Sequence, residues 1–131
     1  MNIARSRLLV VDDEEALLLS YRLILEQKGY SVSTARTSAE AESLLASERY
    51  DLLLCDLSLE RQTSGLDVIR SARRNDPRLG CVLLTGYPDT EISDLAQNDG
   101  VHILFKPVEV SKLLETVEFM LRRRRAEERA S

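Results

Sequence analysis

Leu52-Leu53-Leu54-Cys55-Asp56, near the middle of this 131-residue chain, indicates how the chain folds. Its four consecutive apolar residues leave no polar side, which is typical of a strand covered on both faces in a parallel sheet. Three other runs have the same character, and a fifth run is more polar. They are Leu8–Val11, Cys81–Leu84 and Ile103–Phe105, with Tyr30–Ala35 as the more polar one. These runs predict the five strands of one sheet.

Segments with helical periodicity lie between the apolar runs. The first ends at Gly29, a residue favoured after a helix C-terminus, and the second begins at Thr37 or Ser38, with Glu40 in position for a capping box. The expected helices cover about residues 14–28, 37–48, 65–74 and 88–97, and the last begins near residue 109. Strands that alternate with helices predict a doubly wound α/β domain with helices on both faces of the sheet.

The length and composition fit a single globular domain. Hydrophobic residues make up 44% of the chain and charged residues 31%, and no apolar run approaches the roughly 18 residues of a membrane span. The N-terminal residues do not resemble a signal peptide. The two cysteines lie in apolar runs, so we expect buried, reduced thiols in a cytoplasmic protein, with a redox pair as the weaker alternative.

The charge of the chain is unevenly distributed. The net charge is −4, although residues 122–131 carry five Arg and only two Glu. The remainder is therefore acidic, which argues against a core that binds nucleic acid. We expect the run Arg122–Arg125 to continue the last helix as a solvated end or the start of a linker. Contact of this run with nucleic acid or a membrane is the weaker interpretation.

Polar residues follow four of the five expected strands. Those that come directly after an apolar run are Asp12 and Asp13, Asp56, Thr85 and Lys106. The carboxyl ends of parallel strands share one edge of the sheet, and ligands bind there, where the strand order reverses. If the first strand lies beside the third, the three carboxylates converge. The hydroxyl and the amine then arrive from the strands beyond Asp56.

Three carboxylates in one pocket repel one another unless a cation neutralises them. The ammonium of Lys106 cannot balance three negative charges, and oxygen ligands with no His or Cys nearby favour Mg²⁺. A Lys and a Thr beside such a metal suit the oxygens of a phosphoryl group. We therefore predict that the Asp56 carboxylate attacks phosphorus and gives an aspartyl-phosphate. Each residue alone is often a turn or cap residue, so the prediction depends on their combination.

Together these motifs resemble a bacterial response-regulator receiver domain, a chemotaxis-regulator-like member of the flavodoxin-like fold. The matching segments are Leu9–Glu14, Asp51–Asp56, Leu83–Tyr87 and Phe105–Pro107. The resemblance covers about residues 6–121. It implies a five-stranded parallel (βα)5 sheet in the order 2-1-3-4-5. The receiver domain would occupy residues 1–121, and residues 122–131 would be an Arg-rich extension of the last helix or the start of a linker.

The resemblance also implies an acceptor and a set of metal ligands. Asp56 would take a phosphoryl group from a sensor histidine kinase or a phosphotransfer protein, with Mg²⁺ bound. Asp13 would ligate the metal directly and Asp12 through a water molecule. The backbone carbonyl of Ser58 would complete the ligands from the protein.

Two further residues would respond to the phosphoryl group. Lys106 would pair with its oxygens, and Thr85 would donate a hydrogen bond and shift the loop after the fourth strand. In this family, phosphorylation usually changes the surface formed by the fourth helix, fifth strand and fifth helix. The resemblance leaves open whether this surface meets an output domain, an effector protein or a second copy of the chain in a homodimer. On this interpretation the chain is a phosphoryl acceptor rather than an enzyme, with only self-phosphorylation and slow self-dephosphorylation.

The chain departs from the family pattern at two sites. Receiver domains usually carry an aromatic residue three positions before the lysine, where this chain has Ile103. Tyr87 or Phe105 is a candidate substitute. The loop Leu57–Gly65 also lacks the usual Met-Pro pair, and we expect it to be more mobile because no proline restricts it.

Two other functions compete with the acceptor hypothesis. A phosphohydrolase with an Asp nucleophile typically places a second Asp two residues later, where this chain has Ser58. A pseudo-receiver that binds partners without phosphorylation would fit Ile103 and the altered loop, but it would leave three carboxylates unused at an electrostatic cost. His102 is the only histidine, and we expect it to lie on an edge strand, at the end remote from the pocket.

Overall fold

The computed structural model describes residues 5–59, 64–86, 94 and 100–130. Its centre is a five-stranded parallel sheet in the order β2-β1-β3-β4-β5. The strands are β1 (Arg7–Val11), β2 (Ser31–Ala35), β3 (Leu52–Asp56), β4 (Gly80–Thr85) and β5 (His102–Phe105). The described helices are α1 (Glu15–Gln27), α2 (Ser38–Ser47), α3 (Gly65–Asn75) and α5 (Val110–Ala130).

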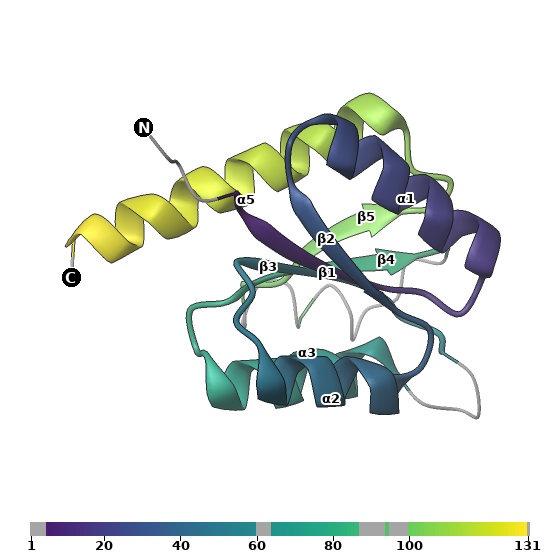
Figure 1. The fold of residues 1–131 in the computed structure, drawn as a ribbon, viewed down its shortest axis with the longest axis horizontal. Helices are drawn as coiled ribbons and strands as arrows, with labels where there is room; N and C mark the ends of the chain where they lie inside the picture. The colour runs from purple at the N-terminus through teal and green to yellow at the C-terminus, as the bar shows by residue number, and fades with distance from the viewer. Residues whose placement is uncertain (1–4, 60–63, 87–93, 95–99, 131) are drawn as a thin grey trace.

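Helices cover both faces of the sheet, as Figure 1 shows. Helices α1 and α5 pack on one face, and α2 and α3 pack on the other. The arrangement confirms the predicted doubly wound fold and the predicted strand order. The helix expected at 88–97 falls outside the described residues, except for Asp94.

Alternate residues of each strand contribute to two separate cores. In β1, Leu8 and Val10 pack beneath α1 and α5, whereas Leu9 and Val11 pack beneath α2 and α3. All four side chains are fully buried, and complete burial of a side chain of this size contributes about 1.5–3 kcal/mol. The strands carry no polar face because helices exclude water from both sides of the sheet.

The strand register brings the carboxyl ends of the central strands to one edge of the sheet. Val11 at the end of β1 pairs with Cys55, so the next residue on each strand is an aspartate. Asp56 in turn pairs with Leu84, which places Thr85 one step beyond it on β4. The crossover between β1 and β3 therefore puts the predicted acidic residues beside each other.

Helix α5 continues beyond the hydrophobic core. Its buried apolar side chains end at Leu121, but the helix extends through Arg122–Arg125 to Ala130. In Figure 1 its yellow C-terminal end projects past the sheet. One arginine of the run, Arg124, is only 6% exposed. The division between a domain ending at 121 and an extension from 122 stays a prediction.

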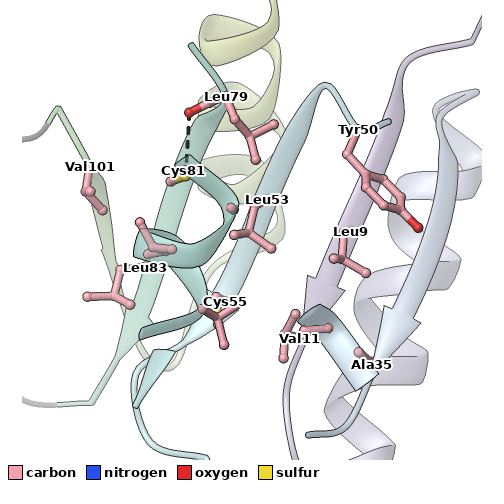
Figure 2. Close-up of a cluster of buried hydrophobic side chains, with 14 of the residues drawn as sticks. Leu9, Val11, Ala35, Tyr50, Leu53, Cys55, Leu79, Cys81, Leu83 and Val101 are labelled. Atoms are coloured by element: carbon pink, nitrogen blue, oxygen red, sulfur yellow. Dashed lines mark hydrogen bonds between the residues drawn. The ribbon is translucent and has the colours of Figure 1, made fainter. Parts of the chain in front are cut away.

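The two cysteines are buried and reduced. Cys55 on β3 and Cys81 on β4 lie in the core shown in Figure 2, where the Cys81 thiol contacts the Leu79 carbonyl oxygen at 3.5 Å. Burial raises the pKa of the Cys55 thiol far above its ordinary value. Burial also raises the pKa of Cys81 to about 11, although Arg73 opposes the increase. Both groups are therefore protonated thiols at neutral pH.

We expect neither cysteine of the folded protein to react with iodoacetamide at about pH 8, because the thiolate is the reacting species and both thiols are buried. In denaturant both should react fully. Intact-mass spectrometry over time would follow both reactions. Equal alkylation rates with and without denaturant would contradict this expectation.

Candidate functional site

Asp12 is a fully buried carboxylate directly after β1. Its backbone N–H donates to the Ala35 carbonyl at 3.1 Å, which extends the pairing of β1 with β2. Its Oδ1 atom accepts from the Glu14 N–H at 2.9 Å and helps to turn the chain into α1. Its Oδ2 atom accepts from Lys106 Nζ at 3.1 Å. Asp12 thus has both the structural role of a turn residue and a place in the predicted pocket.

Asp56, the last residue of β3, is only 7% exposed. Burial raises the pKa of its carboxyl group, and the nearby charge of Asp12 adds to the increase. The charge of Lys106 and a backbone hydrogen bond from Ser58 lower this pKa, but the net pKa of Asp56 remains above its ordinary value. The ionised carboxylate therefore favours an additional positive charge beside it.

The ammonium group of Lys106 lies close to the carboxylates of both Asp12 and Asp56. Its Nζ atom lies 3.1 Å from Asp12 Oδ2 and 3.4 Å from Asp56 Oδ2. Its backbone N–H donates to the Thr85 carbonyl at 2.8 Å, which fixes the start of its side chain at the end of β4. Burial alone would lower the pKa of Lys106, but the hydrogen bond to Asp12 and the charges of Asp12 and Asp56 outweigh it and raise the pKa. The amine is fully charged at neutral pH.

One carboxylate oxygen from each of Asp12, Asp13 and Asp56 lies within 4.8 Å of the other two. Ligand oxygens bind Mg²⁺ at about 2.1 Å, so oxygens on opposite sides of the ion are about 4.2 Å apart. The three oxygens could therefore converge on one ion with little movement. The donor set is all oxygen, which suits a hard divalent cation. The residues present fit a metal of this class.

Two other predicted residues lie near this cluster. Thr85 is 2% exposed and follows Leu84, the partner of Asp56 in the sheet. Ser58 is exposed and forms an isolated antiparallel bridge with Ser64. The structure thus brings the acids and Lys106 together, and it puts Thr85 and Ser58 on the strand and loop beside them. The individual roles assigned to these residues stay predictions.

Gly65 is a residue of this site that the sequence did not single out. It begins α3, and its N–H donates to the Leu57 carbonyl at 2.8 Å. A Cβ atom at Gly65 would lie 2.1 Å from the backbone carbonyl oxygen of Asp56. Only a residue without a side chain allows α3 to approach β3 this closely. The sequence signal was a glycine shortly after the acidic residue, but the contact itself requires the fold.

Tyr21 lies on α1, within the helical segment expected at about residues 14–28, and the sequence did not single it out as a site residue. It is 7% exposed, and no described residue hydrogen-bonds to its hydroxyl. Burial raises the pKa of this phenol, while Lys106 lowers it and the negative charges of Asp12 and Asp56 raise it. Its polar end therefore lies within the electric field of the acidic pocket, which helical periodicity alone could not indicate.

Strand β5 contains His102, Ile103 and Phe105, three residues that the sequence analysis singled out. His102 begins this edge strand, at the end opposite Lys106, as expected. Burial lowers the pKa of His102, and the charge of Lys112 lowers it further. Ile103 packs against the core beneath α3, and Phe105 is 54% exposed. The other suggested aromatic substitute, Tyr87, lies outside the described residues.

Residues 8–118 match the response regulator receiver domain family. The chain belongs to this family and is a receiver domain of two-component response regulators. This identification agrees with the acidic cluster and the sheet order, which were predicted from the sequence.

Known response regulators are similar to this chain over most of its length. The alginate biosynthesis transcriptional regulatory protein AlgB of Pseudomonas putida is 39% identical over 111 residues, which cover 83% of this chain and 24% of AlgB. The response regulator MprA of Mycobacterium bovis BCG is 34% identical and covers 95% of this chain and 54% of MprA. The chain therefore spans only about a quarter of the length of AlgB.

The fold agrees with solved receiver structures. A CheY-like receiver domain protein from Methanospirillum hungatei superposes with a TM-score of 0.89 and 32% identity, covering 95% of this chain and 99% of that one. The receiver domain of an HD-domain protein from Pseudomonas fluorescens gives a TM-score of 0.85 and 28% identity, covering 98% of each chain. Among the described residues, no helix combines the length and apolarity needed to cross a bilayer.

Proposed function

We propose that this domain is a phosphoryl acceptor in which Asp56 receives a phosphoryl group from a sensor histidine kinase or phosphotransfer protein, with Mg²⁺ bound. The observation that carries the proposal is the position of Lys106 Nζ, within 3.4 Å of carboxylates from two different strands. A buried acid beside an amine and a further acidic pair provides a nucleophile and binding groups for cation and phosphoryl oxygens.

The hydrogen bonds of Asp12 bear on how this residue would meet a bound metal. Both oxygens of Asp12 accept hydrogen bonds, from the Glu14 N–H and from Lys106. Asp13 is half-buried. We assign direct metal ligation to Asp13 and Asp56 and ligation by the Ser58 carbonyl as the receiver-domain resemblance implies, and the two occupied oxygens of Asp12 suit its assigned contact through water. When bound, Mg²⁺ would neutralise the carboxylates and polarise the phosphoryl oxygens.

The transfer step requires little covalent chemistry from the protein. An Asp56 carboxylate oxygen forms the new O–P bond while the N–P bond of the donor phosphohistidine breaks, and the leaving imidazole nitrogen takes the electron pair. Lys106 places positive charge beside the transferred group, and the Thr85 hydroxyl donates a hydrogen bond to it. The product is an aspartyl-phosphate. We propose no turnover of a separate substrate, only self-phosphorylation and slow self-dephosphorylation.

The downstream events are also proposals. The transferred group would change the surface formed by the fourth helix, β5 and α5, and that surface would meet an output domain, an effector or a second copy of the chain. AlgB carries the words transcriptional regulatory protein in its name and is about four times as long as the match. A phosphorylation-independent interaction module is not favoured, because it would leave the buried acids of the pocket without a use.

Incubation with Mg²⁺ and a small phosphodonor such as acetyl phosphate is expected to add one phosphate to the wild-type chain. The bond should be labile to hydroxylamine, and chelation of Mg²⁺ should prevent its formation. Asp56→Asn should take up none, because the amide is not a nucleophile toward phosphorus. Intact-mass spectrometry measures the added phosphate directly.

The matched control for this variant is Asp67→Asn. Asp67 is an exposed residue of α3 whose carboxylate pairs with Arg70 at 3.7 Å, and it is not a member of the acidic cluster. It should take up phosphate at the wild-type rate. Absence of phosphate on the wild-type chain, or uptake by Asp56→Asn equal to that of Asp67→Asn, would refute the proposal.

A further inference from the structure

Arg124 is the buried member of the arginine run. Its neighbours Arg123 and Arg125 are exposed, whereas Arg124 is only 6% exposed. It follows Val117 and Leu121 at helical spacing, so the side of α5 that faces the domain continues for one turn beyond the apolar core. We call residues 122–130, the last part of α5, the C-terminal arm. The arm is attached to the domain by a charged side chain.

The guanidinium of Arg124 joins the arm to two distant segments. It approaches Asp76 Oδ2 at 2.9 Å and Asp51 Oδ1 at 3.7 Å, and it donates to the Arg78 carbonyl at 3.1 Å. It also lies 3.2 Å from Glu128 within the arm. Arg124 is buried while its acidic partners are partly exposed, so loss of these contacts would leave the buried guanidinium charge without a counter-ion.

These two segments are the far ends of the elements that meet at the acceptor. Asp51 directly precedes β3, which ends at Asp56. Asp76 directly follows α3, which begins at Gly65 against the backbone carbonyl of Asp56. A strand and a helix therefore each have one end at the acceptor and the other at Arg124.

We propose that Arg124 clamps the C-terminal arm to β3 and α3, and that a change at the acceptor pocket reaches the arm through these two elements. The clamp itself is independent of the proposed function, whereas the coupling rests on it. Packed strands and helices move as rigid bodies, so a tilt at one end displaces the other. This route does not require the aromatic residue that receiver domains usually carry at the position of Ile103. In each state of the pocket, the C-terminal arm would leave the domain in one defined direction, and that direction would differ between the two states.

Hydrogen exchange of the full-length chain tests the clamp. Arg124→Gln should accelerate amide exchange in residues 122–130 by about tenfold, because the arm loses its attachment and frays. Arg125→Gln is the matched control, since it removes the same charge from an exposed residue that forms no ion pair with a described residue. Asp76→Asn should also accelerate exchange, while its Oδ1 can still accept from the Arg78 N–H. Equal exchange in Arg124→Gln and Arg125→Gln would overturn the clamp.

Beryllofluoride with Mg²⁺, a mimic of the phosphoryl group, tests the coupling. It should protect residues 52–59 of the wild-type chain and change exchange in the arm by about fivefold, at the lower end of typical coupling factors. In Arg124→Gln, residues 52–59 should still be protected but the arm should not respond. The coupling alone would be overturned if exchange in the arm still changed in Arg124→Gln. It would also be overturned if residues 52–59 of the wild-type chain were protected while exchange in its arm did not change. An unprotected wild-type pocket would count against both the coupling and the proposed function.

Discussion

Gly65→Ala is expected to lower the free energy of unfolding by about 3 kcal/mol and to slow phosphate uptake at Asp56 by about a hundredfold. The new Cβ would lie 2.1 Å from the Asp56 carbonyl oxygen and 3.1 Å from Cys55 Sγ. A backbone oxygen cannot rotate away as a flexible side chain can, so α3 must move outward by about 1 Å to restore van der Waals contact. The movement would displace the acceptor and the loop that begins at Leu57.

Gly86→Ala is the matched control for stability. Apart from its chain neighbours, no atom of a described residue lies within 4 Å of a Cβ atom at Gly86, and its φ is not in the left-handed region. Its free energy of unfolding should stay within about 0.5 kcal/mol of the wild-type value. Urea denaturation measures both variants, and mass spectrometry measures the uptake rate of Gly65→Ala. A Gly65→Ala chain as stable as Gly86→Ala would show that α3 accommodates the methyl group without moving.

The strands of this fold could be predicted because a strand that is buried on both faces appears in the sequence as a short run of consecutive apolar residues. The run Leu52–Cys55 has no polar residue, and β3 is indeed buried throughout. Helix ends were also readable, since Gly29 follows α1 and adopts a φ of 95°, which few residues other than glycine tolerate. The convergence of Asp12 with Asp56 needed one further fact, the strand order, which the residues alone left conditional.

The contacts that remained hidden depend on residues far apart in the chain. Arg124 lies 48 residues from Asp76, and a run of four arginines is more often solvated than buried. Helical spacing from Val117 and Leu121 was the available signal, because it places Arg124 on the covered side of α5. Nothing in the sequence marked the acidic partner.

Lys106→Met is expected to have opposite effects on metal binding and on phosphate uptake. The amine lies 3.1 Å from Asp12 and 3.4 Å from Asp56, where it repels a cation bound by the same carboxylates. Unit charges about 4 Å apart interact by about 4 kcal/mol at an effective dielectric of 20, and one third of that energy corresponds to about tenfold in affinity. Mg²⁺ should therefore bind at least about tenfold more tightly to the variant, as calorimetry would measure.

Phosphate uptake by Lys106→Met should nevertheless fall by about a hundredfold, because the transferred group loses the charge that stabilises it in the transition state. Lys112→Met is the matched control, since Lys112 is exposed on α5 and forms no ion pair with a described residue. It should match the wild-type chain in both measurements. Tighter Mg²⁺ binding with slower uptake would separate the two roles of the pocket, holding a cation and stabilising a transferred anion. Weaker Mg²⁺ binding would instead mean that Lys106 orders the carboxylates more than it repels the ion, and unchanged uptake would remove the amine from the reaction.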